Sequence, residues 1–444
     1  MRFVGVANLP EGWGAATIGE MVESKVSQEG PTERGEFAYV DISSVDNATK
    51  RIESPRTLSD TEAPSRARQN LKAGDVLVSM TRPNLNAVAL VPLALDGAVG
   101  STGFDVLRTR VLDPRWIYYF TQTPGFVQAM SAKVQGALYP AIRQKDVREF
   151  PLPVPPLPEQ RRIVEAIEAN FARLEAGVAA LELARSKLER YRASVLESVW
   201  MIGGTTTTQL GSLVTEHLCN GISIKGSDTP PGTPALRLSA MGENGFDYTD
   251  VRYLPLDSET ARDLAIRADE FFISRGNGSL HLVGRGTVAQ TPPRQIVYPD
   301  TMTRVRLDRS RVDPRWVALM WASRGVRRQI EARVKTTAGI FKISHPQMET
   351  ILVPLPDLKV QASLVREVSL LLKDSRESLL GICGALTRSS ALRQSILKTA
   401  FEGRLAAQDP RDESASALLE RVRHGRAPAA SSPSGRNRKK PVAG

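Results

Sequence analysis

The sequence has few of the side chains that mark disulfide-rich or metal-binding proteins. It contains two cysteines and four histidines in 444 residues. Two cysteines cannot build a disulfide framework, and they fit the reducing environment of the cytoplasm. The four histidines are scattered and lack metal-ligand spacing, so we expect no metal site. A secreted mini-protein is excluded.

Long apolar runs are also missing. The best one, residues 87–95, is interrupted by Pro92 and is far shorter than the ~20 residues that span a membrane. Near the amino end, Pro10 and Glu11 stand where a signal peptide needs an apolar core. We therefore expect a cytoplasmic protein that makes no membrane contact. The overall composition, 41% hydrophobic and 24% charged, is that of a globular chain.

Charge is present in excess of one sign. Lys and Arg number 59 against 48 Asp and Glu, a net charge of +11, which suggests a polyanionic partner. The last 41 residues, 404–444, carry nine bases and four acids, so five of the eleven charges lie there. Two basic stretches remain, residues 108–148 and 304–342, at matching places along the chain. Solvated helix faces are the alternative interpretation of either stretch alone.

The chain contains an internal duplication. Asp113–Trp116 (DPRW) recurs as Asp313–Trp316 at an offset of 200 residues. Residues 155–200 then match residues 356–401 without a gap, whereas the offset drifts over the first ~100 residues of each half. Each half therefore has a front segment, in which the spacing differs between the two copies, and a rigid back segment, in which the copies align without a gap. We expect both repeated tryptophans to be core residues.

Each rigid back is predicted to be a long helix. Proline at the first turn of the first copy and Gly203-Gly204 after it are typical start and stop signals. Apolar residues recur three and four apart, as in a coiled-coil seam. The predicted seam positions are Ile163, Ile167, Phe171, Leu174, Val178, Leu181, Leu188, Tyr191, Val195 and Val199 in the first copy, and Leu364, Val368, Leu371, Leu379, Ile382, Leu386, Leu392 and Ile396 in the second. The seams can pair only if the second helix runs back along the first.

The fronts are predicted to be mixed α/β globules. Short β-branched or aromatic runs such as FAYVDISSV, DVLVSM and EFFIS are separated by Gly, Pro and Asn, and a helical segment follows them. The predicted fold class is mixed α+β, with two pseudo-symmetric α/β domains joined by two long antiparallel coiled-coil helices. The predicted segments are domain 1 (1–157), a central helix (158–203), domain 2 (204–355), a second helix (356–405), and a basic extension (406–444) that is disordered at its end.

These features together resemble the specificity subunit of type I restriction–modification systems. The resemblance rests on PLPVPPLPEQRRIVEAIE after GALYPAIRQKDVREF, on STGFDVLR, on RGNGS, and on the duplicated globule-plus-helix plan. It covers roughly residues 8–405. The second helix entry, PLPDLKVQASLV, departs from the pattern because Val360 replaces the acid.

The resemblance implies a DNA-binding protein of phage defence. Each globule would be a target recognition domain for one half of a split sequence in double-stranded DNA. The paired helices would set the unread gap and dock two methyltransferase subunits, which two restriction (nuclease and translocase) subunits would join. The chain itself would be no enzyme and would bind no cofactor. S-adenosylmethionine for DNA methylation, ATP and Mg²⁺ would be held by the partner subunits.

Candidate DNA contacts follow from residue type, since Arg, Lys, Asn and Gln read base edges and basic side chains contact phosphates. In the first half they are Arg82, Asn84, Asn86, Tyr139, Arg143 and Lys145; in the second half they are Arg275, Asn277, Ser279, Lys335, Phe341 and Lys342. A tight turn that needs Gly or Asn is the alternative for the two loops. An ordered loop with a packed aromatic is the alternative for the segments before each long helix.

The sequence offers no catalytic constellation. An Asn-Pro-Pro-aromatic loop for adenine methylation and a GxxxxGK[ST] phosphate loop are both absent, and Glu23-Ser24-Lys25 lacks the upstream Asp of a nuclease site. We infer recognition without catalysis. A self-sufficient nuclease or methyltransferase with an unfamiliar site, and a coiled-coil scaffold that binds proteins, remain the alternative functions.

Overall fold

A computed structural model describes residues 9–28, 30, 35–134, 140–203, 206–243, 245–337 and 339–425. The chain divides into two compact units. Unit 1 comprises residues 1–179 and 385–444, and unit 2 comprises residues 180–384. Both predicted long helices are present, as α5 (Leu157–Gly203) and α10 (Leu358–Phe401). Each long helix therefore contributes one part to unit 1 and the other part to unit 2.

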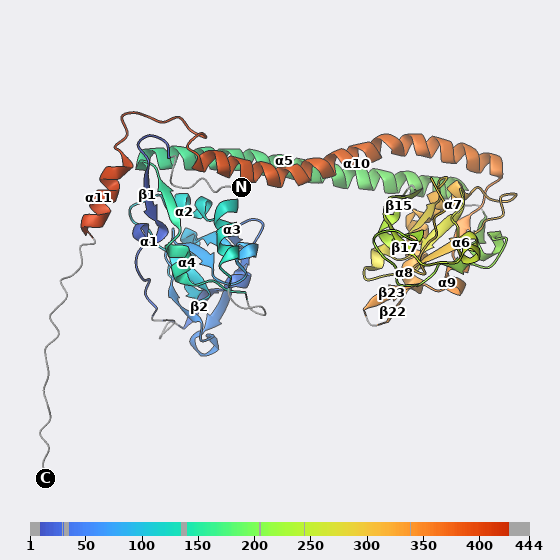
Figure 1. Ribbon diagram of the computed structural model, residues 1–444, viewed down its shortest axis with the longest axis horizontal. Coiled ribbons are helices and arrows are strands. Elements are labelled where there is room, and N and C mark those ends of the chain that lie inside the picture. The colour runs from blue at the N-terminus through green and yellow to red at the C-terminus, as the bar shows by residue number, and fades with distance from the viewer. Residues whose placement is uncertain are drawn as a thin grey trace, which may run out of the picture. The chain divides into compact units, whose positions relative to one another are not determined.

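Unit 1 holds two main sheets with short helices beside them (Figure 1). A three-stranded sheet has the order β10-β7-β8, and a four-stranded sheet has the order β5-β2-β9-β6 with β2 and β9 parallel. The pairs β1-β11 and β3-β4 complete the unit. Its strands are β1 (Gly14–Thr17), β2 (Glu36–Val40), β3 (Val45–Asp46), β4 (Arg51–Ile52), β5 (Arg56–Ser59), β6 (Ala67–Asn70), β7 (Val76–Ser79), β8 (Val88–Leu90), β9 (Val99–Ser101), β10 (Phe104–Leu107) and β11 (Pro151–Val154). Its short helices are α1 (Ile18–Met21), α2 (Pro114–Phe120), α3 (Pro124–Ala132) and α4 (Gln144–Arg148).

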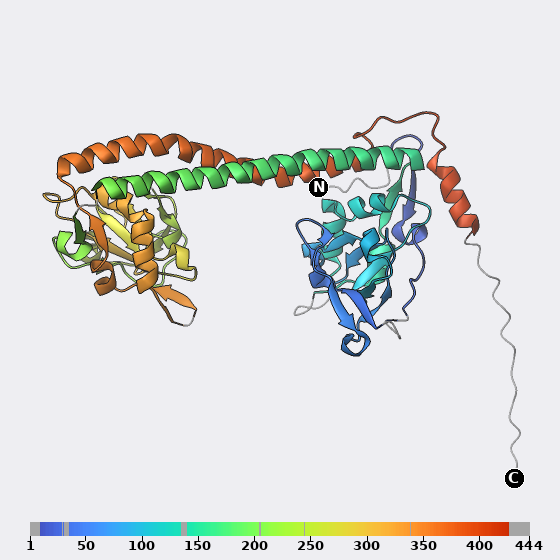
Figure 2. The same cartoon turned by 180° about the vertical axis from the view of Figure 1, so that it is seen from behind.

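Unit 2 repeats this plan around a four-stranded sheet of order β13-β21-β18-β20 (Figure 2). The smaller sheets are β12-β24, β14-β17, β15-β16 and β19-β23-β22. Its strands are β12 (Thr207–Gln209), β13 (Cys219–Asn220), β14 (Thr233–Leu236), β15 (Met241–Gly242), β16 (Gly245–Phe246), β17 (Val251–Leu254), β18 (Phe271–Ser274), β19 (Gly276–Asn277), β20 (Gly286–Val288), β21 (Met302–Val305), β22 (Lys335–Thr337), β23 (Ile340–Lys342) and β24 (Leu352–Pro354). Its short helices are α6 (Ser258–Asp263), α7 (Pro314–Trp321), α8 (Arg324–Arg333) and α9 (His345–Glu349). The predicted mixed fold with two similar halves is confirmed.

A glutamine at the start of each long helix ties that helix to its own unit. In unit 1 the main-chain N–H of Asp113 donates to Gln160 Oε1 at 3.1 Å, and Gln160 Nε2 donates to the carbonyl of Pro155 at 2.8 Å. In unit 2 the N–H of Asp313 donates to Gln361 Oε1 at 2.8 Å, and Gln361 Nε2 donates to a proline carbonyl at 2.7 Å. Both glutamines are fully buried. We call each arrangement a glutamine clamp.

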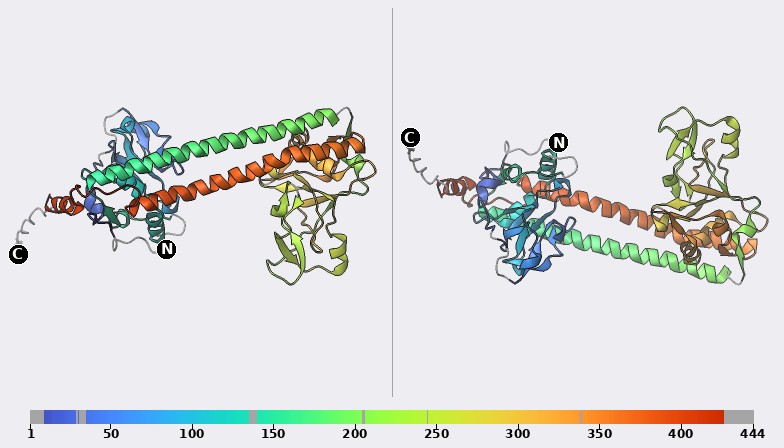
Figure 3. Two further views of the ribbon diagram at one scale, coloured as in Figure 1. Left: turned by 90° about the horizontal axis from the view of Figure 1, so that it is seen from above. Right: turned by 90° about the horizontal axis from the view of Figure 1, so that it is seen from below.

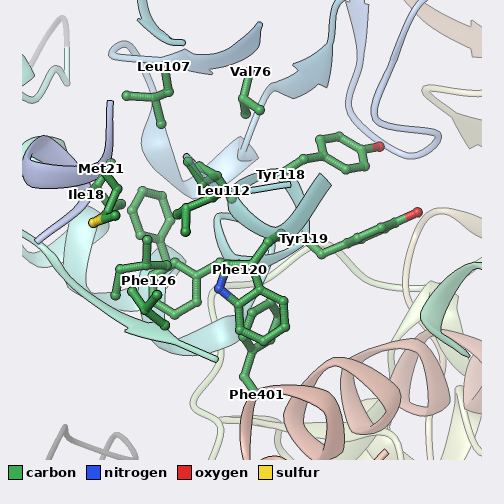
Figure 4. Packing of buried hydrophobic residues seen from close by; sticks show 14 of the residues in the cluster. Ile18, Met21, Val76, Leu107, Leu112, Tyr118, Tyr119, Phe120, Phe126 and Phe401 are labelled. Carbon is green, nitrogen blue, oxygen red and sulfur yellow. The ribbon is translucent and has the colours of Figure 1, made fainter. Parts of the chain in front are cut away.

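The repeated tryptophans follow the clamped aspartates by three residues. Trp116 and Trp316 are fully buried, as predicted. Their indole N–H groups donate to the carbonyls of Pro153 and Pro354, at 2.9 and 2.8 Å. In unit 1, Phe401 from the end of α10 points into the same aromatic cluster, with its ring 4.4 Å from that of Trp116 (Figure 4). The core of unit 1 therefore needs residues from both ends of the chain.

The long helices lie side by side within each unit (Figure 3). In unit 1 the guanidinium of Arg393 lies 4.0 Å from the centre of the Phe171 ring and 3.4 Å from Glu175. The seam prediction is wrong at Tyr191, Leu371 and Leu392, which are about half exposed. One residue along a helix turns a side chain by about 100°. Next to Leu371, for example, it is Leu372 that is buried.

A short helix in the carboxyl-terminal extension was not predicted. Helix α11 (Ala415–Gly425) buries Ala415 and Leu419 against unit 1. Leu419 approaches so closely that a Cβ at Gly14 would lie 2.5 Å from its terminal methyl group, so a larger residue there would require the leucine to move. Residues 426–444, the part of the extension predicted to be disordered, lie outside the described residues.

We expect the glutamine clamps to stabilise both units. Replacing Gln160 by Leu leaves the N–H of Asp113 and the carbonyl of Pro155 without that partner in a buried site, which costs about 1–3 kcal/mol. Gln361→Leu removes the equivalent bonds in unit 2. Denaturant unfolding of the full chain measures both losses.

The matched control is Gln128→Leu, because Gln128 is exposed on α3. Its free energy of unfolding should change by no more than about 0.5 kcal/mol. A loss in the control as large as that in the clamp variants would contradict the role given to the clamps.

Candidate functional site

The predicted residues of the second half meet on one small sheet of unit 2. Strand β23 pairs with β22 on one side and with β19 on the other. Asn277 on β19 lies opposite Phe341, and Lys335 on β22 lies opposite Lys342. Figure 2 shows β22 and β23 projecting from the body of the unit. Sequence reasoning named these residues separately, and the structure brings them together.

Two lysines face each other across this sheet. Lys335 and Lys342 occupy paired positions of the antiparallel ladder, and both are exposed. Within the described part of the chain, neither ammonium forms an ion pair or a side-chain hydrogen bond. Like charges directly opposite each other on a sheet are destabilising. An anion that lies over the two lysines would offset their repulsion and lower the free energy of the sheet.

Arg275 and Ser279 border the same sheet. The carbonyl of Arg275 accepts a hydrogen bond from the N–H of Ile343 at 3.0 Å, which joins the loop to the segment before α9. The Asn277 side chain accepts from the N–H of Ser279 at 3.0 Å and so shapes the turn. Burial, assisted by the positive charge of Arg275, lowers the pKa of His345. This part of unit 2 thus presents positive and amide side chains together.

The loop of the first half, residues 82–86, occupies the corresponding place in unit 1. There the N–H of Ile142 donates to the carbonyl of Met80 at 2.8 Å, as Ile343 does to Arg275 in unit 2. Arg82 and Asn84 are exposed. Among the described residues, neither side chain forms a hydrogen bond or ion pair with the protein. Both remain available to a ligand.

The other predicted residues of unit 1 have structural partners. The N–H of Arg143, the residue that caps α4, donates to Asp146 at 2.9 Å, and Lys145 lies 3.4 Å from Glu149. Asn86 is half buried, and its side-chain amide donates to the carbonyl of Thr121 at 3.1 Å. Tyr139 lies outside the described residues.

Several bases of the two basic stretches are consumed by internal ion pairs. Arg108 contacts Asp75 at 2.7 Å, and the hydrogen bonds that its guanidinium donates to that carboxylate raise the pKa of the arginine. In unit 2, Arg306 contacts Glu270 at 2.8 Å in the equivalent position. These pairs link the central strands to their neighbours. The number of bases in a stretch therefore overstates the charge available to a ligand.

Lys50 is a residue of this region that the sequence did not single out. It lies in the turn between β3 and β4, and its ammonium donates to the main-chain carbonyl of Asn86 at 2.5 Å. The local sequence feature that points to this turn is Asp46, four residues earlier, whose carboxylate accepts two main-chain hydrogen bonds within the turn. No spacing rule connects the turn to a loop 36 residues away.

The described residues also contain no group of side chains that could bind a metal ion. Within the described ranges, no three His, Cys, Asp or Glu side chains gather in a way that could hold a metal ion. Nor does any helix of that same part of the chain have the length and apolar character to cross a membrane.

Comparisons with known proteins agree on one family. A family model described as the type I restriction modification DNA specificity domain matches residues 10–181. The specificity subunit of the type I restriction enzyme EcoKI of Escherichia coli K12 is 27% identical over 385 residues, which cover 81% of this chain and 82% of that protein. The StySPI specificity subunit of Salmonella potsdam is 26% identical, with the same two coverages.

Solved structures give the same result. A chain from a study of complex assembly and conformational transition of the type I R-M system has a TM-score of 0.71 at 25% identity, covering 89% of this chain and 99% of its own. Over most of its length the chain is therefore similar to type I specificity subunits. The HsdS subunit of Thermoanaerobacter tengcongensis, also 25% identical, matches this chain with a TM-score of 0.54 and coverages of 90% and 99%. The resemblance stated from the sequence is confirmed.

The facing lysines of unit 2 predict that replacing one of them gives a measurable gain in stability. In Lys335→Glu, an opposite charge faces Lys342, which should stabilise the pairing of β22 with β23 by roughly 0.2–1 kcal/mol. Slower hydrogen exchange of the amides on both strands would report the gain. Lys335→Gln, which removes the repulsion without adding an attraction, should give a smaller gain. Unchanged exchange in both variants would contradict the repulsion.

Proposed function

We propose that this chain is a type I specificity subunit and recognises one split sequence in double-stranded DNA, with unit 1 reading one half-site and unit 2 the other. The observation that carries the proposal is the pair of facing, exposed lysines of unit 2, Lys335 and Lys342. A surface that is destabilised by its own charge is suited to a polyanion. The equivalent place in unit 1 offers Arg82 and Asn84, both exposed.

The two kinds of side chain have different tasks in the proposal. Lys335 and Lys342 contact phosphates, which give affinity and orientation but carry no sequence information. Arg82, Asn84, Arg275 and Asn277 contact base edges, because a guanidinium matches guanine and an amide matches adenine in the major groove. Two half-sites read by one chain add their free energies without paying the cost of association twice. The unread gap would depend on the length of α5, which both units share.

The chemistry belongs to partner subunits in this proposal. The 444 residues hold neither an Asn-Pro-Pro-aromatic loop nor a GxxxxGK[ST] phosphate loop. We therefore place S-adenosylmethionine on two methyltransferase subunits, and ATP and Mg²⁺ on two restriction subunits, all assembled on this chain. The proposed substrate, genomic DNA, puts the assembly in the cytoplasm.

A binding experiment tests the phosphate contacts. The specificity subunit, assembled with its methyltransferase, is titrated onto duplex DNA that carries the full target, at several salt concentrations. Lys335→Glu and Lys342→Ala should each weaken binding, and each lost phosphate contact should lower the slope of log K against log salt by about 1. Because Lys335→Glu should also stabilise the sheet, unfolding cannot explain its weaker binding.

The control variant is Lys225→Ala, which removes the same charge from an exposed loop elsewhere in unit 2 and should leave the slope unchanged. Equal slopes for all variants would contradict the proposed phosphate contacts. Methylation or cleavage of DNA by the purified chain alone, with S-adenosylmethionine or ATP and Mg²⁺, would instead favour a self-sufficient enzyme. No DNA binding even at low salt would favour a protein-binding scaffold.

A further inference from the structure

Unit 1 concentrates unusual backbone conformations beside its candidate reading loop. Of the described residues other than glycine, four have a positive φ: Lys50 (58°), Arg82 (46°), Asn86 (48°) and Asp269 (65°). Three of these four belong to the loop 82–86 and to the turn that contacts it. Left-handed backbone is unfavourable for residues with a long side chain, and it persists only where surrounding contacts enforce it. Some contact must therefore hold this loop.

Lys50 and Asn86 are held by one set of hydrogen bonds. The ammonium of Lys50 donates to the carbonyl of Asn86 at 2.5 Å. The hydroxyl of Tyr118 on α2 donates to the carbonyl of Lys50 at 3.0 Å, and the amide of Asn86 donates to the carbonyl of Thr121, just after α2, at 3.1 Å. The turn and the loop are thus fixed to each other and to one helix.

The loop itself is a single turn of 3₁₀ helix between two left-handed residues. Pro83–Leu85 form the turn, with Arg82 before it and Asn86 after it. Pro83 is buried, whereas Arg82 and Asn84 are exposed. The N–H of Asn86 donates to the carbonyl of Pro83 at 3.0 Å. Because the turn is closed at both ends, a displacement of Asn86 moves Arg82 and Asn84 as well.

The surroundings of Lys50 suit a charged donor to a carbonyl rather than an ion pair. Burial, together with the nearby Arg393, lowers the pKa of Lys50 to about 8, while Asp46 opposes that shift. The guanidinium of Arg393 is itself engaged by Glu175 at 3.4 Å. Among the described residues, the Lys50 ammonium makes no ion pair. Its hydrogen bond is made to the reading loop.

We propose that Lys50 is a positioning residue for DNA recognition by unit 1. Its ammonium holds the carbonyl of Asn86 and so keeps Arg82 and Asn84 in the orientation that reads one half-site. Lys50 does not itself contact bases in this proposal. The inference rests on the proposed function, since it needs unit 1 to read DNA. It predicts an effect on one half-site only.

The test uses the specificity subunit assembled with its methyltransferase. Methylation of genomic DNA first defines the two half-sites. Competition binding then measures how well duplexes with either half-site altered compete with the full target. Lys50→Met should reduce discrimination at the half-site of unit 1 by about tenfold, the value of one lost base contact. Discrimination at the half-site of unit 2 should not change.

Two further variants separate positioning from general damage. Lys50→Arg keeps a charged donor and should retain most of the discrimination. Lys72→Met removes an equivalent charge from an exposed position of unit 1 outside this set of bonds, and it should behave as the unaltered protein at both half-sites. Melting temperatures of all variants are compared, so that a loss caused by unfolding, which would reduce binding to every duplex, is recognised.

The pH dependence gives a signature that a merely structural role would not produce. Below pH 8 the Lys50 ammonium is charged, and above it the charge is lost, so discrimination at the half-site of unit 1 should fall from pH 7 to pH 9. Facing groups do not titrate in that range, because hydrogen bonds lower the pKa of Asp46 and burial raises the pKa of Tyr118. His345 near the other site has a lowered pKa, so unit 2 serves as the internal control.

The outcomes are distinct. A loss confined to the half-site of unit 1 in Lys50→Met, with the fall above pH 8 abolished, supports the inference. Unchanged discrimination, or an equal loss at both half-sites, overturns it while leaving DNA recognition intact. The absence of any sequence preference in the unaltered assembly would overturn the proposed function, and the inference would fall with it.

Discussion

One buried glutamine in each half joins the globular front to the long helix. Gln160 and Gln361 each accept from the aspartate of the DPRW motif, which caps the short helix that follows, and each donates to a proline carbonyl at the entry to the long helix. Both partners are main-chain groups, so the clamp constrains the path of the backbone and leaves the side chains around it free to differ. This explains how two fronts with drifting sequence offsets keep the same attachment to their helices. The surfaces that are proposed to read DNA are therefore attached to a long helix in the same way in both units.

Prediction from the sequence succeeded where a repeated motif or a fixed repeat offset is compatible with a single structure. The fixed offset located both long helices, and the repeated DPRW motif located the two buried tryptophans. It was weaker on the helix faces, where the error of one residue at Leu371 exchanges a buried side chain for an exposed one. Periodicity defines a stripe along the helix, but the width of that stripe depends on which neighbours pack against it.

The candidate site could be predicted in part. Residue type alone named Lys335 and Lys342, but only strand pairing places them opposite each other. The partnership of Lys50 with Asn86 joins residues 36 apart through a lysine tip and a main-chain carbonyl, and no sequence pattern encodes such a bond. Helix α11 was not predicted for a different reason. Helix α11 buries only Ala415 and Leu419, too few apolar positions to stand out in a charged segment.

The discontinuity of unit 1 has a consequence for synthesis on the ribosome. Unit 2 is a single stretch of chain, residues 180–384, so all of its parts are available once that stretch has emerged. Unit 1 begins earlier but lacks Phe401 and Leu419 until the chain is nearly finished, because both lie in its core. At about 5–20 residues per second, its front waits on the order of ten seconds or more for those residues. The half that is made first is therefore the half that finishes folding last.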